Sequence, residues 1–304
     1  MLTPNSIYCI DVLDGMKQID AETADIVIAD PPYNIGKNFG NNFDAMEFDE
    51  YRAWCKAWIN ECIRVIKPNG TIFIYGFSEK LAYLFTDIKI NKRWLIWHYT
   101  NKNVASLHFW QRSHESIIAC WKDKPLFNRD LVREPYTETF LQNAAGKKRK
   151  RGASRFGKGN KETIYVAHEN GALPRDVIKV STLAGGNGGE VWAKCLDCNV
   201  VCNTRVCKNT HNGHNLIQHP TQKPLEPCKK LIKSCMPIRQ QGLLVVPFVG
   251  SGSECVAARD LGVQYIGFDI NPDYIEIANA RIQADNSSIY LDNQGDDPEL
   301  SLFG

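Results

Sequence analysis

Residues 26–33 read Ile-Val-Ile-Ala-Asp-Pro-Pro-Tyr, a short apolar run that stops at an aspartate and two prolines. Proline has no backbone N–H and cannot continue a buried strand, so residues 26–29 are predicted to form a strand with Asp30 at its carboxyl end. Apolar and aromatic residues then recur at helical spacing over 51–65, a turn is expected at 67–70, and residues 71–75 form the next apolar run. This strand, helix, strand order predicts a parallel sheet.

A similar pattern returns near the end of the chain. Helices are expected over 225–235 and 253–261, with strands over 243–246 and 264–268. Between about Phe127 and Gly213, glycines, asparagines and basic residues replace the apolar periodicity. The chain is therefore predicted to be an α/β protein, with a Rossmann-like, mainly parallel sheet covered by helices on both faces and interrupted by an inserted region.

The composition is that of a globular protein, with 43% hydrophobic and 23% charged residues in 304. No run reaches the roughly 18 apolar residues of a membrane span, and the first residues lack a secretion signal, which predicts an intracellular, soluble protein with no membrane partner. Residues 122–161 hold 12 Lys or Arg against 4 Asp or Glu, whereas five acidic residues and no basic ones follow Arg281. The net charge of +2 therefore hides a basic middle and an acidic tail.

Residues 247–253, Pro-Phe-Val-Gly-Ser-Gly-Ser, lie between a predicted strand and a predicted helix. Glycines let the backbone approach a ligand closely, and the helix start offers free N–H groups. Seventeen residues beyond Gly252 the next strand ends at Asp269, whose carboxylate can accept both hydroxyls of a ribose. The spacing fits a nucleoside ligand, although a Gly-x-Gly turn by itself is equally an ordinary tight turn.

The tetrapeptide Asp30-Pro31-Pro32-Tyr33 offers a carboxylate, a carbonyl followed by a residue without an N–H, and an aromatic face. These groups can hold a planar amine by two hydrogen bonds while stacking on its ring. The alternative is structural, with the prolines ending the strand and Tyr33 as a packing residue.

Together with residues 219–224, His-Pro-Thr-Gln-Lys-Pro, and the glycine turn, this tetrapeptide resembles the signature of the amino-methylating DNA methyltransferases. The motif order is similar to that of the permuted β group, in which the catalytic motif comes first, the recognition region second and the cofactor loop last. The resemblance covers residues 7–125 and 173–282. It implies the permuted fold of methyltransferases that use S-adenosyl-L-methionine, with double-stranded DNA as the partner. A cognate restriction endonuclease and a homodimer are further candidate partners.

The same resemblance implies a division of the chain. Residues 1–126 would be the catalytic half, 127–215 the target-recognition region, 216–282 the cofactor-binding half and 283–304 an acidic tail. In the catalytic motif, Asp30 and the carbonyl of Pro31 would accept hydrogen bonds from the target amino group, Pro32 would complete the motif, and Tyr33 would stack on the flipped base.

The residues that the resemblance assigns to the cofactor are Asp11 at its adenine, Asp269 at its ribose, Phe248, Gly250 and Gly252 around its methionine part, and Thr221 and Lys223 on its carboxylate side. Val246 stands where the family usually has aspartate, so one polar contact expected near the cofactor is missing.

Asp before Pro-Pro-Tyr favours adenine over cytosine in this family, which predicts a site-specific methyltransferase acting on the N6 amino group of adenine in DNA. The alternatives are methylation of cytosine N4, methylation of RNA, and a DNA-binding protein of this fold that has lost catalysis, for which Val246 is the sole sign. The pair His114-Glu115 also resembles a family element beside the target pocket, with a structural role as an equal alternative.

A basic run lies in the predicted recognition region and is predicted to contact DNA phosphates. Its residues are Lys147, Lys148, Arg149, Lys150, Arg151 and Arg155. A solvated loop and a localisation signal are the alternatives.

Four of the 11 cysteines cluster near the end of the same region. Cys195, Cys198, Cys202 and Cys207, followed by His211 and His214, have the residue types of a tetrahedral zinc site. The spacing of the second cysteine pair fits no standard pattern, so a structural zinc at the four cysteines and ordinary reduced loop thiols both stay open.

Overall fold

The computed structural model describes residues 2–39, 44–101, 106–143, 146–150, 162–164, 166–183, 190–204, 206, 213–238 and 241–284. The chain divides into two compact units, one formed by Met1–Leu126 with Asp176–Gly304 and the other by Phe127–Arg175. The predicted recognition region, residues 127–215, thus takes in the whole second unit and part of the first.

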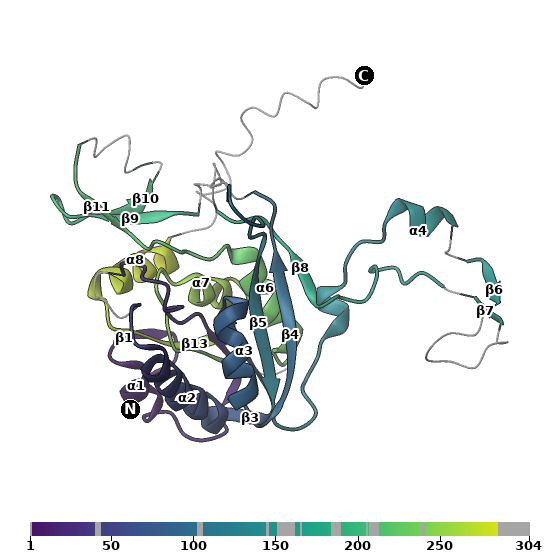
Figure 1. Ribbon diagram of the computed structural model, residues 1–304, viewed down its shortest axis with the longest axis horizontal. Helices are drawn as coiled ribbons and strands as arrows, with labels where there is room; N and C mark the ends of the chain where they lie inside the picture. The colour runs from purple at the N-terminus through teal and green to yellow at the C-terminus, as the bar shows by residue number, and fades with distance from the viewer. Residues whose placement is uncertain are drawn as a thin grey trace. The chain divides into compact units, whose positions relative to one another are not determined.

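The first unit is built on an eight-stranded sheet with the order β1-β13-β12-β2-β3-β5-β4-β8 (Figure 1). The strands are β1 (Ser6–Cys9), β2 (Ala24–Ala29), β3 (Ile66–Gly76), β4 (Asn91–His98), β5 (His114–Trp121), β8 (Val177–Lys179), β12 (Leu243–Val246) and β13 (Gln264–Asp269). Neighbours from β1 to β3 pair parallel, β5 runs antiparallel to both β3 and β4, and β8 pairs parallel with β4. The predicted mainly parallel sheet is confirmed.

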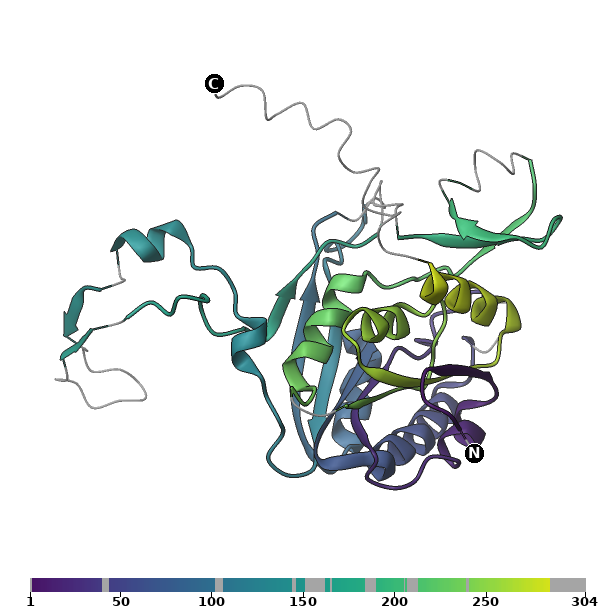
Figure 2. The ribbon, with the colours of Figure 1, turned by 180° about the vertical axis from the view of Figure 1, so that it is seen from behind.

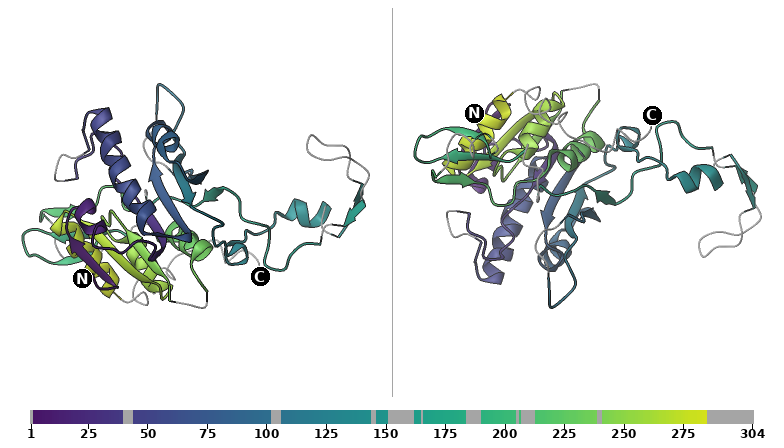
Figure 3. Two further views of the ribbon diagram at one scale, coloured as in Figure 1. Left: turned by 90° about the horizontal axis from the view of Figure 1, so that it is seen from below. Right: turned by 90° about the horizontal axis from the view of Figure 1, so that it is seen from above.

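Helices cover both faces of this sheet because the side chains of its central strands alternate between two cores (Figures 2 and 3). On β2, Val27 and Ala29 pack with one helix layer, while Ile26 and Ile28 pack with the other. The first layer holds α1 (Val12–Met16), α2 (Phe48–Val65) and α3 (Ser78–Asp87); the second holds α6 (Leu225–Cys235), α7 (Ser253–Asp260) and α8 (Pro272–Gln283). All six residues of β2 are buried, which explains the apolar run of residues 26–29.

The predicted helix 225–235 and strand 243–246 have the bounds that the sequence indicated. The turn predicted at 67–70 was wrong, since these residues belong to β3. The pairing of β2 with β3 shifts register between Ala24 and Ile26, so the extra residues form a bulge, a place where a sheet tolerates proline. The ammonium of Lys67 lies 2.8 Å from the carboxylate of Asp25 at this bulge.

Smaller elements make up the rest of the described structure. In the second unit a 3₁₀ helix (Arg129–Val132) precedes α4 (Glu138–Asn143), and β6 (Lys148–Lys150) pairs antiparallel with β7 (Glu162–Ile164). In the first unit, β9 (Trp192–Cys195) is the central strand of a three-stranded antiparallel sheet with β10 (Val201–Asn203) and β11 (Leu216–Gln218). Across the described residues, the helices lack the combination of length and apolar composition that a bilayer span requires.

Candidate active site

Four neighbouring parallel strands end at one edge of the sheet, and a polar or turn residue lies at the end of each or just after it. Asp30 comes directly after β2, Pro247 directly after β12, Asp269 ends β13, and Asp11 lies two residues beyond β1. Ligands of open α/β sheets bind in the crevice at the carboxyl ends of such strands. A pocket lies at this edge.

Ten of the eleven catalytic and cofactor residues predicted from the sequence line this pocket. They are Asp11, Asp30, Pro31, Pro32, Tyr33, Thr221, Lys223, Phe248, Gly250 and Asp269. Gly252 is instead the N-cap of α7, with φ of +81°, where an added Cβ would lie 2.7 Å from the Cβ of Ala278. Val246 is fully buried in the core beside α6 and α7.

The glycine turn and Asp269 hold each other. The N–H of Gly250 donates to Asp269 Oδ2 at 2.7 Å, and the N–H of Asn271 donates to Oδ1 at 2.8 Å. Burial raises the pKa of Asp269, while these N–H groups oppose the shift. Each carboxylate oxygen keeps a lone pair, so Asp269 can still accept from a ligand hydroxyl.

Two further contacts shape this half of the pocket. Gly250 has φ of +50°, and an added Cβ would lie 2.7 Å from His219 Nε2, so the neighbouring histidine ring itself requires glycine there. Burial, together with the charge of Lys223, lowers the pKa of His219 to about 3, which keeps the ring neutral. Asp11 accepts from the N–H of Leu13 at 2.8 Å and caps α1.

At the other half of the pocket, Asp30, Tyr33 and Glu115 surround the buried side chain of Lys223, and we call these four residues the Asp30 cluster. Lys223 Nζ lies 2.8 Å from Asp30 Oδ2 and 3.2 Å from Glu115 Oε2. The Tyr33 hydroxyl lies 2.6 Å from Asp30 Oδ1 and 3.0 Å from Glu115 Oε2. The side chain of Lys223 is 4% exposed, so water hardly screens these contacts.

The charges of the Asp30 cluster fix its protonation. Burial would lower the pKa of Lys223, but the carboxylates of Asp30 and Glu115 outweigh burial and raise that pKa, so the ammonium stays charged. Burial, with the charges of the same two carboxylates, raises the pKa of Tyr33 well above its usual value. The resemblance assigned Lys223 to the carboxylate side of the cofactor, whereas in the structure its ammonium meets the catalytic motif.

The structure also clarifies the pair His114-Glu115 on β5. Glu115 joins the Asp30 cluster, whereas His114 Nε2 lies 3.3 Å from the hydroxyl oxygen of Ser78. Sequence reasoning left a structural role for the pair as an equal alternative, because the pattern gave no sign that a lysine more than a hundred residues later meets Glu115.

Glu254 is a pocket residue that sequence reasoning missed. It is 3% exposed in the first turn of α7 and lines the pocket. Burial, followed by the charge of Asp30, raises its pKa to about 7. An acidic residue in a first helical turn is common, because it interacts favourably with the helix dipole, so Glu254 did not stand out in the sequence. The sign of its burial in the sequence is the run of small apolar residues that follows it, Cys-Val-Ala-Ala, which packs this turn into the core.

Replacement of Glu254 by glutamine is expected to flatten the pH dependence of stability between about pH 4.5 and 7. Because the pKa is raised in the folded state, the protonated acid is favoured there, and its contribution is complete at low pH and is lost as the pH rises through 7. The loss amounts to about 3 kcal/mol for a shift of this size. Urea unfolding of both proteins across this pH range measures it, and parallel curves would contradict the assignment.

The other predicted residues fall into two places. In the basic run, exposed Lys147 donates to the carbonyl of Gln142 at 2.9 Å, Lys148, Arg149 and Lys150 form β6, and Arg151 and Arg155 lie outside the described residues. Among the cysteines, Cys195 and Cys198 come together with His214. Cys202 lies on β10 and is disulfide-bonded, while Cys207 and His211 lie outside the described residues.

Comparison with protein families matches residues 24–280 to the N6/N4 methyltransferase family, described as DNA methylase. The chain is 26% identical to the type II methyltransferase M.HpaI of Haemophilus parainfluenzae over 286 residues, covering 92% of this chain and 74% of that protein. It is 27% identical to the DNA adenine methyltransferase YhdJ of Escherichia coli K12 over 277 residues, covering 90% of this chain and 80% of that protein.

Solved structures show the same fold. The PvuII DNA methyltransferase, which is cytosine-N4-specific, superposes with a TM-score of 0.62 at 13% identity, covering 96% of this chain and 93% of that one. The complex of M1.HpyAVI with SAM superposes with a TM-score of 0.53 at 17% identity, covering 92% of this chain and 99% of that one.

Proposed function

Because the chain belongs to the DNA methylase family of N6 and N4 methyltransferases, we propose that it transfers a methyl group from S-adenosyl-L-methionine to the N6 amino group of a flipped adenine in DNA. One observation carries the proposal: a single pocket joins the Asp-Pro-Pro-Tyr motif to the glycine turn and Asp269. A group that can hold an amine therefore faces a site suited to a nucleoside.

S-adenosyl-L-methionine supplies an electrophilic methyl group on a sulfonium. Asp269 and the backbone around Gly250 would hold its ribose and methionine parts, and Asp11 its adenine. Asp30 and the carbonyl of Pro31 would accept the hydrogens of the target amino group and orient its nitrogen toward the methyl. Each oxygen of Asp30 already meets Tyr33 or Lys223 and keeps a second lone pair for this bond.

Lys223 Nζ lies 2.8 Å from Asp30 Oδ2, so the carboxylate has a cationic partner inside the pocket. A weak base is sufficient, because the amino group becomes acidic only as its nitrogen gains positive charge in the transfer. Asp30 therefore acts mainly by orienting the amine and by accepting its proton late.

The similar proteins do not decide between the two bases, because they include the adenine methyltransferase YhdJ and the cytosine-N4-specific PvuII enzyme. Adenine is therefore inferred from Asp30 at the head of the motif. Incubation of the protein with DNA or RNA and isotope-labelled S-adenosyl-L-methionine, followed by mass spectrometry of the nucleosides, tests this. We expect N6-methyladenine in DNA. Label in N4-methylcytosine or in RNA would favour those alternatives, and cofactor binding without transfer would favour the inactive DNA-binding protein.

We further propose that residues 127–215 recognise the target and that the basic run holds DNA phosphates. A cognate restriction endonuclease and a homodimer stay predictions, as does the role of residues 283–304, of which 285–304 lie outside the described residues.

Neutral residues in place of 147–151 are expected to weaken DNA binding on every sequence alike, because phosphate contacts carry no base information. The slope of log affinity against log salt should fall by about 0.9 for each phosphate contact removed. Binding titrations at several salt concentrations measure this, with exposed Lys56 and Lys89 replaced as the control. A changed base preference at an unchanged slope would show that these residues read bases.

A further inference from the structure

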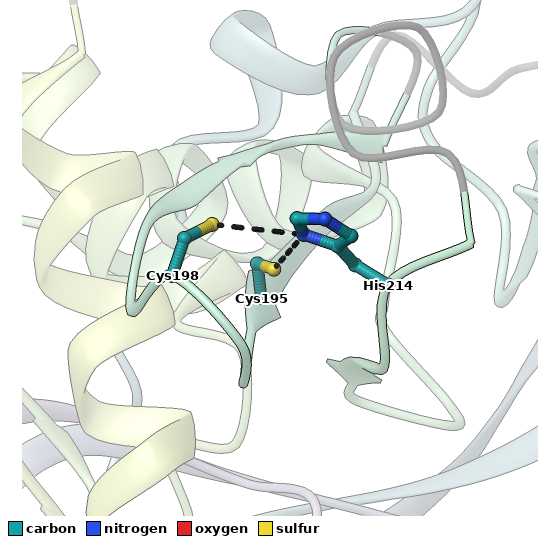
Figure 4. A group of neighbouring side chains, drawn as sticks. All are labelled: Cys195, Cys198 and His214. Carbon is teal, nitrogen blue, oxygen red and sulfur yellow. Dashed lines mark hydrogen bonds between the residues drawn. The ribbon is translucent and has the colours of Figure 1, made fainter.

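The small sheet of β9, β10 and β11 brings three metal-binding side chains together (Figure 4). Cys195 ends β9, Cys198 lies in the turn that leads to β10, and His214 comes two residues before β11. Since Leu216 pairs with Cys195 across the sheet, the register of β11 sets His214 opposite the turn. Two segments far apart in the sequence thus meet at one end of the sheet.

The spacing of the three ligand atoms suits a tetrahedral metal. His214 Nδ1 lies 3.3 Å from Cys195 Sγ and 4.0 Å from Cys198 Sγ, and all three atoms lie within 4.8 Å of one another. Zinc bonds of about 2.3 Å to sulfur and 2.0 Å to nitrogen place ligands about 3.6 Å apart at tetrahedral angles. Small side-chain movements would therefore admit the ion.

The backbone around the three side chains is held at Asn215, the residue that follows His214. Asp197, between the two cysteines, accepts from the N–H of Asn215 at 2.6 Å, and the N–H of Leu196 donates to the carbonyl of Asn215 at 2.9 Å. Asn199 adopts φ of +55°, which turns the chain back sharply after Cys198 so that the N–H of Cys195 reaches the carbonyl of Val200. The ligand positions are thus organised by the fold itself.

We propose that Cys195, Cys198 and His214 bind a structural zinc ion that ties the β9–β10 turn to the start of β11. Two thiolates and one imidazole are ligands that zinc favours, and a further donor completes the tetrahedron. The sequence predicted Cys202 as a further zinc ligand. In the structure Cys202 lies on β10 opposite Ala193, outside the group of Cys195, Cys198 and His214, and His214 takes its place.

Among the residues that the structure describes, the small sheet buries few apolar side chains. Ala193 and Cys195 are its buried apolar residues on β9, and the residues of β10 and β11 are half-buried or exposed. Lys194 Nζ meets Asp273 at 2.7 Å and Glu276 at 2.8 Å, which joins β9 to α8. Metal binding would therefore supply folding energy to part of the proposed recognition region, independently of methyl transfer.

Elemental analysis of the full-length protein, purified without added metal, tests the site. We expect about one zinc per chain in the wild type and in the control Cys202→Ser, and a loss of zinc in Cys195→Ser, Cys198→Ser and His214→Ala. Wild-type protein without zinc, or variants at these three positions that retain it, would overturn the proposal. Loss of zinc from Cys202→Ser would overturn the assigned ligand set.

A second measurement covers the case in which a variant fails to fold. Wild-type protein, stripped of metal and refilled with Co²⁺, should show the visible bands of a tetrahedral site and a thiolate-to-cobalt charge-transfer band. Chelation should speed hydrogen exchange in residues 192–203 and 216–218, while 243–246 and 264–269 on the main sheet stay protected. Octahedral cobalt bands, or unchanged exchange in the small sheet, would contradict a structural zinc.

Discussion

Alanine at position 30 is expected to slow methyl transfer by about 10²- to 10⁴-fold while binding of S-adenosyl-L-methionine stays within a few-fold of wild type. The reason is placement. Asp30 lies in the Asp30 cluster with Lys223 and Tyr33, whereas the proposed ribose contact, Asp269, ends a different strand, β13. Single-turnover rates with labelled cofactor measure transfer, and calorimetry measures cofactor binding.

Asp269→Ala is the matched control, because it removes another carboxylate of the same pocket. It should weaken cofactor binding by about 1–3 kcal/mol, the scale of a lost charge-assisted hydrogen bond. Transfer at saturating cofactor should change less than in Asp30→Ala. Wild-type turnover in Asp30→Ala would refute the catalytic assignment, and loss of cofactor binding in both variants would show only that the pocket had collapsed.

The sequence predicted those parts of the fold whose cause is local. The strand at β2 follows from four apolar residues ended by prolines, and α6 and β12 follow from clear periodicity. The bulge in β3 was not predicted, because Lys67-Pro68-Asn69-Gly70 consists of residue types that are common in turns. Whether such residues end a strand or form a bulge within it depends on the pairing with the neighbouring strand.

Contacts across long sequence separations limited the prediction of the site. The Asp-Pro-Pro-Tyr motif, the glycine turn and Asp269 converge because parallel strands end at one edge, a rule that a sequence can use. The pairing of Lys223 with Asp30 and Glu115 depends instead on how the loop before α6 passes β2 and β5, which no spacing encodes. His214 joins Cys195 through the register of β11 in the same way. The sequence showed residue types that can bind a metal, and the register of β11 determines which of them meet.

Replacement of Lys223 by methionine is expected to destabilise the protein by about 3–5 kcal/mol near pH 8, because it leaves two carboxylates that are only 13% and 16% exposed without their counter-charge. Methionine fills a similar volume, so lost packing contributes little. Lys67→Met is the control: it also breaks an ion pair with a buried aspartate, Asp25, but Lys67 is 36% exposed and water can replace the ammonium. Its cost should be smaller, about 1 kcal/mol.

A second substitution tells a charge role of Lys223 from a packing role. In the wild type the raised pKa of Lys223 makes its contribution to stability complete below the ordinary value of a lysine, and that contribution is lost only as the pH rises from there toward the folded value. In Lys223→Met, Asp30 and Glu115 lack their shared cation, and Glu115→Gln removes one of the two carboxylates. Glu115→Gln added to Lys223→Met should therefore recover part of the deficit in urea unfolding at pH 8. A deficit that Glu115→Gln leaves unchanged would indicate packing, and intact stability with weakened binding of S-adenosyl-L-methionine would return Lys223 to the cofactor carboxylate that the sequence resemblance assigned to it.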